Sequence, residues 1–528
     1  MKFFLKNIDA FFEKNTNLYF LYLACFLISF WYLSLYSMYG LNYLDEGFVI
    51  NSMNRLLNGE VPYRDFFTLL TPGFFYFGAI LLKIFGNSIE TLRFLMVFFG
   101  SLLSLLVFKI LFYITKNLFL SGLGWIVSVF FGLSLGLISP SYSWNSVLLA
   151  IISMIFLFDF VKNGKSNSGY FSGLFLFLAG FFKQSIGFYA FVAYLIILVY
   201  LYFSFNKEKT VSFIKKFVLV LLSLSFVYLS FFVYTGAFSD MYTYILKFPL
   251  TVFSEARLYP PSIYQLKNIF FDFRVENLSP YLFYFQLLVL ITSFVLILRN
   301  FYRRKVDSYL FILFVFSAFI FLHNFERYSF LKVRTTLPLL IVLFFYLIWK
   351  LINFKRDYRK IIIVSLVFCV VALSSASYYL REKYFKYLNY DSEFLQIDGL
   401  LVNVNTNIKY DKLIDDINLF IQKDELLFIY PMNPMLYSLL GRQNPTRFDL
   451  VIPGNFDENI LDEIIETLEI RNVKYLVYDE PHYMDDKKFE DYAKKLNDYI
   501  RAHFHVYKSF PEYEGAVIYI RNDVIVNY

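Results

Sequence analysis

The sequence predicts a polytopic α-helical membrane protein with an α/β domain after its last membrane helix, and three observations lead to this prediction. Hydrophobic residues make up 58% of the 528 residues and charged residues only 17%, whereas a soluble domain carries about 25% charged residues. About eleven apolar runs come close to or exceed the ~20 residues with which a helix crosses a bilayer. After residue 380 the apolar runs stop and charged residues become frequent. The net charge of +7 is typical of cytoplasmic loops rather than of nucleic-acid binding.

The predicted membrane helices follow the apolar runs in order. They lie at 17–39, 91–113, 118–138, 144–161, 170–184, 187–205, 213–236, 281–298, 309–322, 331–349 and 361–380. The stretch 170–205 is too long for one crossing, and the polar residues around Lys183 favour dividing it into two helices. Pro72–Gly86 is apolar but has only about 15 residues, so it suits an interfacial or re-entrant helix better than a crossing.

Lysine and arginine residues predict the orientation. If the N-terminus is cytoplasmic and Pro72–Gly86 does not cross, the dense basic clusters fall inside, while the short external loop 139–143 has no Lys or Arg. An odd number of crossings then places the C-terminus outside. We therefore predict a transmembrane domain over 1–384, with external loops 40–90 and 237–280, and an extracytoplasmic domain over 385–528.

The C-terminal segment has the pattern of a small α/β domain. Short apolar runs predict buried strands at 426–431, 473–479 and 516–521. Apolar residues at helical spacing predict helices at 458–470 and 489–502. The order strand, helix, strand, helix, strand indicates one α/β domain.

The first external loop carries the candidate acids. Asp45 and Glu46 follow the first membrane helix and begin a predicted surface helix that Gly59 ends, and Asp65 follows the turn at Pro62. Carboxylates on both sides of such a helix can surround a polar acceptor at the level of lipid headgroups. Each also has a structural explanation, because acids favour helix N-termini and Asp favours turns.

Candidate cations lie near the predicted outer face of the membrane. Lys183 is in an apolar stretch, where an ionisable residue is a functional hypothesis by default and snorkelling is the alternative. Arg93 begins a membrane helix, and the same alternative applies to it. Arg327, Lys332 and Arg334 cluster on the outer side against the positive-inside bias, which favours an anionic ligand.

The loop sequence DEGFVINSMNRLLNGEVPYRDFFTLLTPGFFYF (45–77) resembles the first external loop of bacterial GT-C glycosyltransferases. This superfamily includes protein O-mannosyltransferases, lipid A aminoarabinose transferases and lipopolysaccharide-core transferases. Three further segments resemble it: LRF (92–94), AGFFKQ (179–184) and, in the C-terminal domain, YPMNPMLYSLLGRQNPTRF (430–448).

The resemblance implies an inverting transferase in the bacterial plasma membrane. The donor would be a hexose or pentose on polyprenyl phosphate, and the acceptor a lipid, a glycan or a protein. Asp45 would be the catalytic base, with Glu46 and Asp65 as further catalytic candidates. The chemistry agrees, because carboxylates can take the acceptor's proton and cations can neutralise the leaving phosphate. The candidates for binding that phosphate are Lys183, Arg93, Arg327, Lys332 and Arg334.

Two questions stay open at this level. Many relatives carry Arg, Asp and His ahead of a late Leu-Pro, but here Ser329 and Lys332 replace the acid and the His after Arg327. No cofactor is therefore firmly predicted, although acidic pairs can bind Mg²⁺ or Mn²⁺. The alternative function is a transporter or flippase of lipid-linked sugars, for which inverted repeats and polar midplane sites would be typical.

Overall fold

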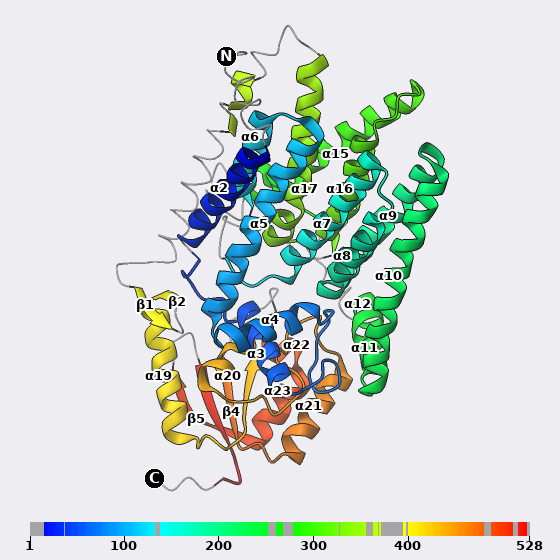
Figure 1. Cartoon of the computed structure of the whole chain (residues 1–528). Coiled ribbons are helices and arrows are strands. Elements are labelled where there is room, and N and C mark those ends of the chain that lie inside the picture. The colour runs from blue at the N-terminus through cyan, green and yellow to red at the C-terminus, as the bar shows by residue number, and fades with distance from the viewer. Residues whose placement is uncertain are drawn as a thin grey trace. The chain divides into compact units, whose positions relative to one another are not determined.

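The computed structural model forms two compact units (Figure 1). Unit 1 comprises residues 1–37, 94–227 and 258–388, and unit 2 comprises residues 38–93, 228–257 and 389–528. The predicted domain division at residue 384 stays a prediction. The residues described by the structure are 15–35, 37–132, 138–251, 260–267, 278–326, 328–354, 363–367, 369–370, 394–397, 400–479, 487–510 and 516–524.

Among the described residues, eight helices are long and apolar enough to cross a membrane, which confirms the predicted polytopic helical class. They are α2 (Asn15–Ser34), α5 (Ile89–Thr115), α7 (Tyr142–Asn163), α9 (Gln184–Ser204), α10 (Lys207–Tyr234), α15 (Ser279–Tyr302), α16 (Ser308–Phe321) with the 3₁₀ turn η4 (Leu322–Phe325), and α17 (Phe330–Phe354). Three more apolar helices in the described part of the chain are shorter, namely α4 (Gly73–Phe85), α6 (Leu118–Phe131) and α8 (Ser168–Phe182). The predicted helix 361–380 lies largely outside the described residues, so the count of eleven stays a prediction.

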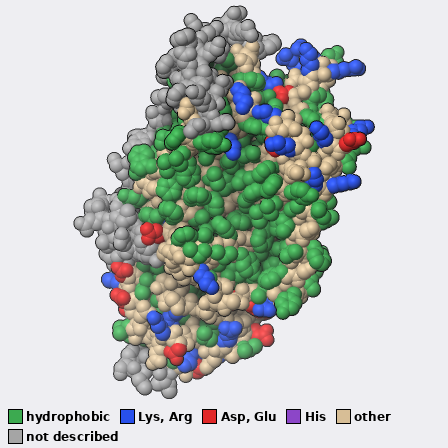
Figure 2. Space-filling model, viewed as in Figure 1, with side chains coloured by type: hydrophobic (Ala, Val, Ile, Leu, Met, Phe, Trp, Pro, Cys, Tyr) green, Lys and Arg blue, Asp and Glu red, His purple; other side chains and the backbone are tan. Residues whose placement is uncertain are grey.

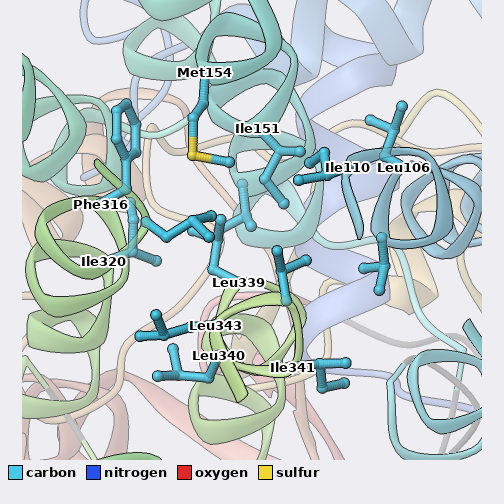
Figure 3. Close-up of a cluster of buried hydrophobic side chains, with 14 of the residues drawn as sticks. Leu106, Ile110, Ile151, Met154, Phe316, Ile320, Leu339, Leu340, Ile341 and Leu343 are labelled. Atoms are coloured by element: carbon cyan, nitrogen blue, oxygen red, sulfur yellow. The ribbon is translucent and has the colours of Figure 1, made fainter. Parts of the chain in front are cut away.

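Buried aliphatic and aromatic side chains hold the helices of unit 1 together. Figure 3 shows the centre of this core, where α5, α7, α16 and α17 meet. The labelled side chains are Leu106, Ile110, Ile151, Met154, Phe316, Ile320, Leu339, Leu340, Ile341 and Leu343, all buried. Because each of these helices is apolar on nearly every face, tight packing rather than a polar–apolar division selects which face turns inward.

The outer surface of unit 1 is apolar over much of its length. Figure 2 shows hydrophobic side chains spread along the helices, with lysine and arginine gathered at one end of α10 and α15. Leu222 and Phe226 of α10 are 65% and 72% exposed, which in water would be an extensive apolar patch. Lys207 and Arg303 are among the exposed basic residues at that end. This distribution is that of a multi-pass membrane protein with one basic side.

The long apolar stretch that we divided in two is broken at Lys183. Helix α8 ends just before Lys183 and α9 begins just after it, because the backbone of Lys183 is extended rather than helical. Gly187 approaches Gly180 so closely that a Cβ on Gly187 would overlap the backbone of Gly180. The predicted division is confirmed, and α7, α8 and α9 pack side by side in unit 1 (Figure 1).

In unit 2 the predicted first external loop forms two short helices that pack on each other, α3 (Asp45–Leu57) and α4 (Gly73–Phe85). Helix α4 buries Ala79 and Leu82 and leaves Ile80 and Ile84 exposed. Its length of about 20 Å, at 1.5 Å per residue, is less than the ~30 Å hydrocarbon layer. That α4 does not cross the membrane stays a prediction.

The C-terminal segment of unit 2 contains a four-stranded sheet, in which three strands match the predicted ones and β5 is additional. Its strand order is β3 (Leu427–Pro431), β4 (Tyr475–Asp479), β6 (Ala516–Arg521) and β5 (Phe504–Phe510). Strands β3 and β4 are parallel and the other two pairs are antiparallel. Helix α21 (Glu458–Ile470) links β3 to β4, and α22 (Phe489–Tyr492) with α23 (Lys494–His503) precedes β5.

Several elements of unit 2 are not in the sequence-based prediction. Strand β5 alternates poorly and carries His505, Lys508 and Ser509, because it is an edge strand with a bulge and five residues that are not fully buried. The remaining described elements are α11 (Phe238–Tyr242), the π-turn η1 (Thr243–Lys247), α12 (Phe248–Leu250), β1 (Phe394–Ile397), β2 (Leu400–Asn403), α19 (Val404–Phe420) and α20 (Met435–Leu440); the 3₁₀ turn η2 (Ile263–Lys267) belongs to unit 1.

Helix α3 packs directly on α20, and Gly47 makes this approach possible. A Cβ on Gly47 would come closer than 3.0 Å to the backbone nitrogen and Cα of Met435. We expect Gly47→Ala to lower the free energy of unfolding by about 1–3 kcal/mol, the usual cost of overpacking. Denaturant titration of the detergent-solubilised chain measures the change. In Gly122→Ala, the matched control in α6, the added Cβ meets no atom within 4 Å, and equal losses in the two variants would contradict the packing argument.

Candidate active site

The start of α3 in unit 2 holds Asp45 in a defined position. The Asp45 N–H donates to Asn42 Oδ1 at 2.9 Å, and the Asn42 side-chain amide donates to the Asp45 carboxylate at 3.2 Å. The Asp45 side chain is exposed. A carboxylate held at a helix N-terminus and open to its surroundings can accept a proton from a bound nucleophile.

The neighbouring residue Glu46 is buried and forms an ion pair with Arg93. Arg93 Nε and Nη2 donate to the two Glu46 oxygens at 2.7 and 2.6 Å, and both side chains are 1% exposed or less. Arg93 also donates to the carbonyl oxygens of Tyr39 and Gly40, at 3.0 and 2.8 Å. The guanidinium therefore ties the chain before α3 to the start of α3. Given these contacts, the predicted contact of Arg93 with a donor phosphate stays a prediction.

Asp65 lies at the other end of α3. Its carbonyl oxygen accepts from Arg55 Nη2 at 2.8 Å, and Arg55 is ten residues, or about 15 Å of helix, from Asp45. The Asp65 carboxylate accepts from Arg64 Nε and Nη2, each at 2.8 Å, and from the Val61 N–H at 2.7 Å. The hydrogen bond from Arg64 is the main reason that the pKa of Asp65 lies below its ordinary value. The structure thus does not bring Asp45 and Asp65 together around one acceptor.

In unit 1, Lys183 and Lys332 meet at a carboxylate that the sequence analysis did not single out. Glu326 Oε2 lies 4.0 Å from Lys183 Nζ and 3.3 Å from Lys332 Nζ. His323 Nδ1 lies 3.0 Å from the same oxygen. We call these four residues the lysine cluster. Burial by itself would raise the pKa of Glu326, but His323 and the two lysines hold it below its usual range.

Lys183 makes two further contacts at the start of α7. Its ammonium donates to Ser143 Oγ at 3.0 Å and lies 4.9 Å from the centre of the Tyr142 ring. The break between α8 and α9 places this ammonium against α7 and against the end of η4. Two lysines on one carboxylate form a group that a phosphate oxygen can enter in place of that carboxylate.

The other two predicted phosphate ligands are Arg334 and Arg327. Arg334 is buried near the start of α17, and its guanidinium lies 4.7 Å from the centre of the Phe330 ring. Arg327 lies outside the described residues. Among the described residues, no group of three or more His, Cys, Asp or Glu side chains is arranged to hold a metal ion. The identity of any cofactor is left open.

Sequence reasoning missed Glu326 and Arg55, and each left a weak signal. Glu326 follows His323 by three residues at the end of an apolar run, a spacing that places both side chains on one face of a helical turn. Arg55 lies in the last turn of α3, and no acid stands three or four residues from it in the sequence. Its partner Asp449 is 394 residues away in sequence, so no local pattern reveals the pair.

The helical fold of unit 1 and the mixed sheet of unit 2 resemble solved structures that have the GT-C fold. ArnT from Cupriavidus metallidurans bound to undecaprenyl phosphate matches with a TM-score of 0.56 at 10% identity, over 96% of this chain and 98% of that one. The oligosaccharyltransferase of Archaeoglobus fulgidus, crystallised with Zn and sulfate, matches with a TM-score of 0.51 at 12% identity, over 93% and 72%. No protein-family model and no curated protein matches the sequence. The likeness is one of fold.

The contribution of the Glu46–Arg93 pair to the free energy of unfolding can be tested directly. We expect Arg93→Met to destabilise the protein by about 3–5 kcal/mol, because it leaves a buried carboxylate without its cation. The exposed pair Arg501–Glu490, at 3.0 Å, is the matched control, and Arg501→Met is expected to cost less than about 1 kcal/mol. Denaturant titration of both variants gives the comparison. A loss from Arg93→Met no larger than that from Arg501→Met would mean that the pair does not hold α3.

Proposed function

We propose that this chain is a membrane glycosyltransferase that moves a sugar from a polyprenyl-phosphate donor to an acceptor on the extracytoplasmic side. The observation that carries the proposal is the exposed Asp45 carboxylate, fixed by Asn42 at the start of α3 beside the buried Glu46–Arg93 pair. The GT-C fold supports it, since its solved examples include ArnT bound to undecaprenyl phosphate. The basic end of α10 and α15 would face the cytoplasm of a bacterium, with the C-terminal segment outside.

In this mechanism the acceptor's hydroxyl or amine attacks the anomeric carbon of the donor sugar. Asp45 takes the proton of the nucleophile as the new bond to the anomeric carbon forms. The bond from that carbon to the phosphate oxygen breaks, and the polyprenyl phosphate leaves with the electron pair. Because attack and departure occur on opposite faces, the anomeric configuration inverts. A general base of this kind contributes a rate factor of ~10²–10⁴.

The lysine cluster is the proposed site for the donor phosphate. In the structure one carboxylate, that of Glu326, is shared by the ammonium groups of Lys183 and Lys332. A phosphate that binds there must take the place of this carboxylate, so Glu326 competes with the donor and with the phosphate product. When no lipid is bound, Glu326 pairs with the lysines, so that the buried Lys183 ammonium is not left without an anion. The same carboxylate assists release of the phosphate product.

Asp45→Asn tests the proposed base. The amide keeps the shape of the side chain but cannot take a proton, so turnover is expected to fall by ~10²–10⁴ while binding of the donor persists. The assay follows radiolabelled sugar from polyprenyl phosphate into membrane glycans in proteoliposomes, and Asp498→Asn on the exposed face of α23 is the matched control. More than about a tenth of wild-type turnover in Asp45→Asn would exclude Asp45 as the base. Movement of the lipid across the bilayer without transfer would instead indicate a flippase.

Two variants of the lysine cluster are expected to change the affinity for polyprenyl phosphate in opposite directions. Lys183→Met removes a phosphate ligand and is expected to weaken binding of polyprenyl phosphate by at least tenfold. Glu326→Gln removes the competing charge and is expected to strengthen the same binding. The affinities can be measured by titrating a fluorescent polyprenyl phosphate into nanodiscs, with Lys207→Met at the basic end of α10 as the control. If both variants weaken binding equally, the cluster has a purely structural role.

A further inference from the structure

Unit 2 contains a cleft that the proposed chemistry does not use. Its volume is about 500 Å³, within the ~300–1,000 Å³ typical of ligand sites. Three segments line it: the turn after α3 (residues 60–65) with Arg55, the loop 443–447 after α20, and the second half of α21 with the residue that follows it (463–471). We call it the arginine cleft, because four arginines lie along it.

A buried arginine forms part of the cleft wall. Arg55 is 5% exposed, and it donates to Glu60 at 2.7 Å, to Asp449 at 3.0 Å and to the carbonyl oxygen of Thr446 at 3.1 Å. These bonds join the first external loop to the C-terminal segment. The cleft is therefore held open by a fixed network rather than by loose loops, which lowers the entropy that a ligand must overcome.

The cleft also offers polar groups that the fold does not fully use. The side chains of Gln443 and Arg471 are exposed and make no hydrogen bond or ion pair to the described residues. Arg447 donates to the Tyr63 carbonyl oxygen at 2.7 Å, yet its Nε is buried without a hydrogen-bond partner among the described residues. The Glu463 carboxylate lies 3.4 Å from Arg447 and is partly exposed. The lining of the cleft thus contains both hydrogen-bond donors and acceptors.

The balance of charge selects the class of ligand. The lining contains four arginines and three carboxylates. Two further carboxylates also form ion pairs with these arginines: Asp449 with Arg55, and Asp240 with Arg447. With the positive charge offset in this way, the cleft does not favour a phosphate or a nucleic acid. Its described lining has no aromatic residue and is more polar than apolar, so a lipid chain or an apolar peptide gains little there. Hydroxyl groups, which donate and accept at once, match a lining that contains guanidinium, amide and carboxylate groups.

We propose that the arginine cleft binds a neutral, hydroxyl-rich oligosaccharide. This inference rests on the proposed function and names the glycan part of its acceptor. The cleft begins at the C-terminal end of α3, about 15 Å along the helix from Asp45, so it holds a part of the acceptor remote from the reacting hydroxyl. Binding energy from such a remote part raises the efficiency of the reaction for long acceptors over short ones.

The test uses the full chain in nanodiscs and carries Asp45→Asn, so that binding is measured without transfer. The probes are hexasaccharides of glucose, mannose and xylose as neutral sugars, trigalacturonate as an acidic sugar, and inorganic phosphate. Isothermal titration calorimetry is expected to detect at least one neutral hexasaccharide, and the double variant Gln443→Ala/Arg471→Ala to weaken that binding at least tenfold. Gln422→Ala/Lys423→Ala, on an exposed segment of unit 2 away from the cleft, is the matched control and is expected to bind as before.

Three results would overturn the inference. They are the absence of binding by all three neutral hexasaccharides, binding by the double variant within twofold of its parent, and stronger binding of trigalacturonate or phosphate at the same residues. A thiol at the rim gives an independent readout, because the neutral sugar should slow maleimide labelling of Gln443→Cys. The binding data stand apart from the transfer assay, so a failure of Asp45 as the base and a failure of the cleft as a glycan site are distinguished.

Discussion

The buried ion pair between Glu46 and Arg93 is the interaction on which the geometry of the candidate base depends. It places two full charges in a nearly solvent-free environment, where each is tolerated only because the other, together with two backbone carbonyl groups, satisfies it. The pair fixes the direction in which the chain enters α3. Asp45, one residue before Glu46, is exposed. Adjacent acids therefore have different roles: one orients the helix, and the other is available for chemistry.

The same constraint, that buried charges must be paired, organises the other polar sites. In unit 1 it gathers Lys183, Lys332 and His323 around Glu326. In unit 2 it sets Arg55 between Glu60 and Asp449. The lysine cluster has a carboxylate that a ligand can replace. Arg55, by contrast, donates hydrogen bonds to Glu60, Asp449 and two backbone carbonyl oxygens, and it supports the wall of the cleft. The difference between a binding group and a supporting group thus lies in whether the partner can be exchanged.

Helix packing in unit 1 shows how little polarity is needed to position such groups. The break at Lys183 comes from a single extended residue, and the close approach of Gly187 to Gly180 holds the two helices together beside it. The core of unit 1 is formed by buried aliphatic and aromatic side chains, as Figure 3 shows where α5, α7, α16 and α17 meet. A rigid apolar frame is what allows a lysine at a helix break to keep a fixed position.

Local periodicity and composition were enough to predict the helical membrane class, the helix before Gly59, the division near Lys183, and the strands β3, β4 and β6. The sequence also pointed to Asp45, Glu46 and Lys183, whose unusual setting is visible locally. The fold alone reveals that Arg93 pairs with Glu46, that Asp65 lies apart from Asp45, and that Glu326 and Arg55 form ion pairs. These are pairings between residues tens to hundreds of positions apart, and the energy of a buried charge depends on which partner the fold brings to it rather than on its neighbours in the chain.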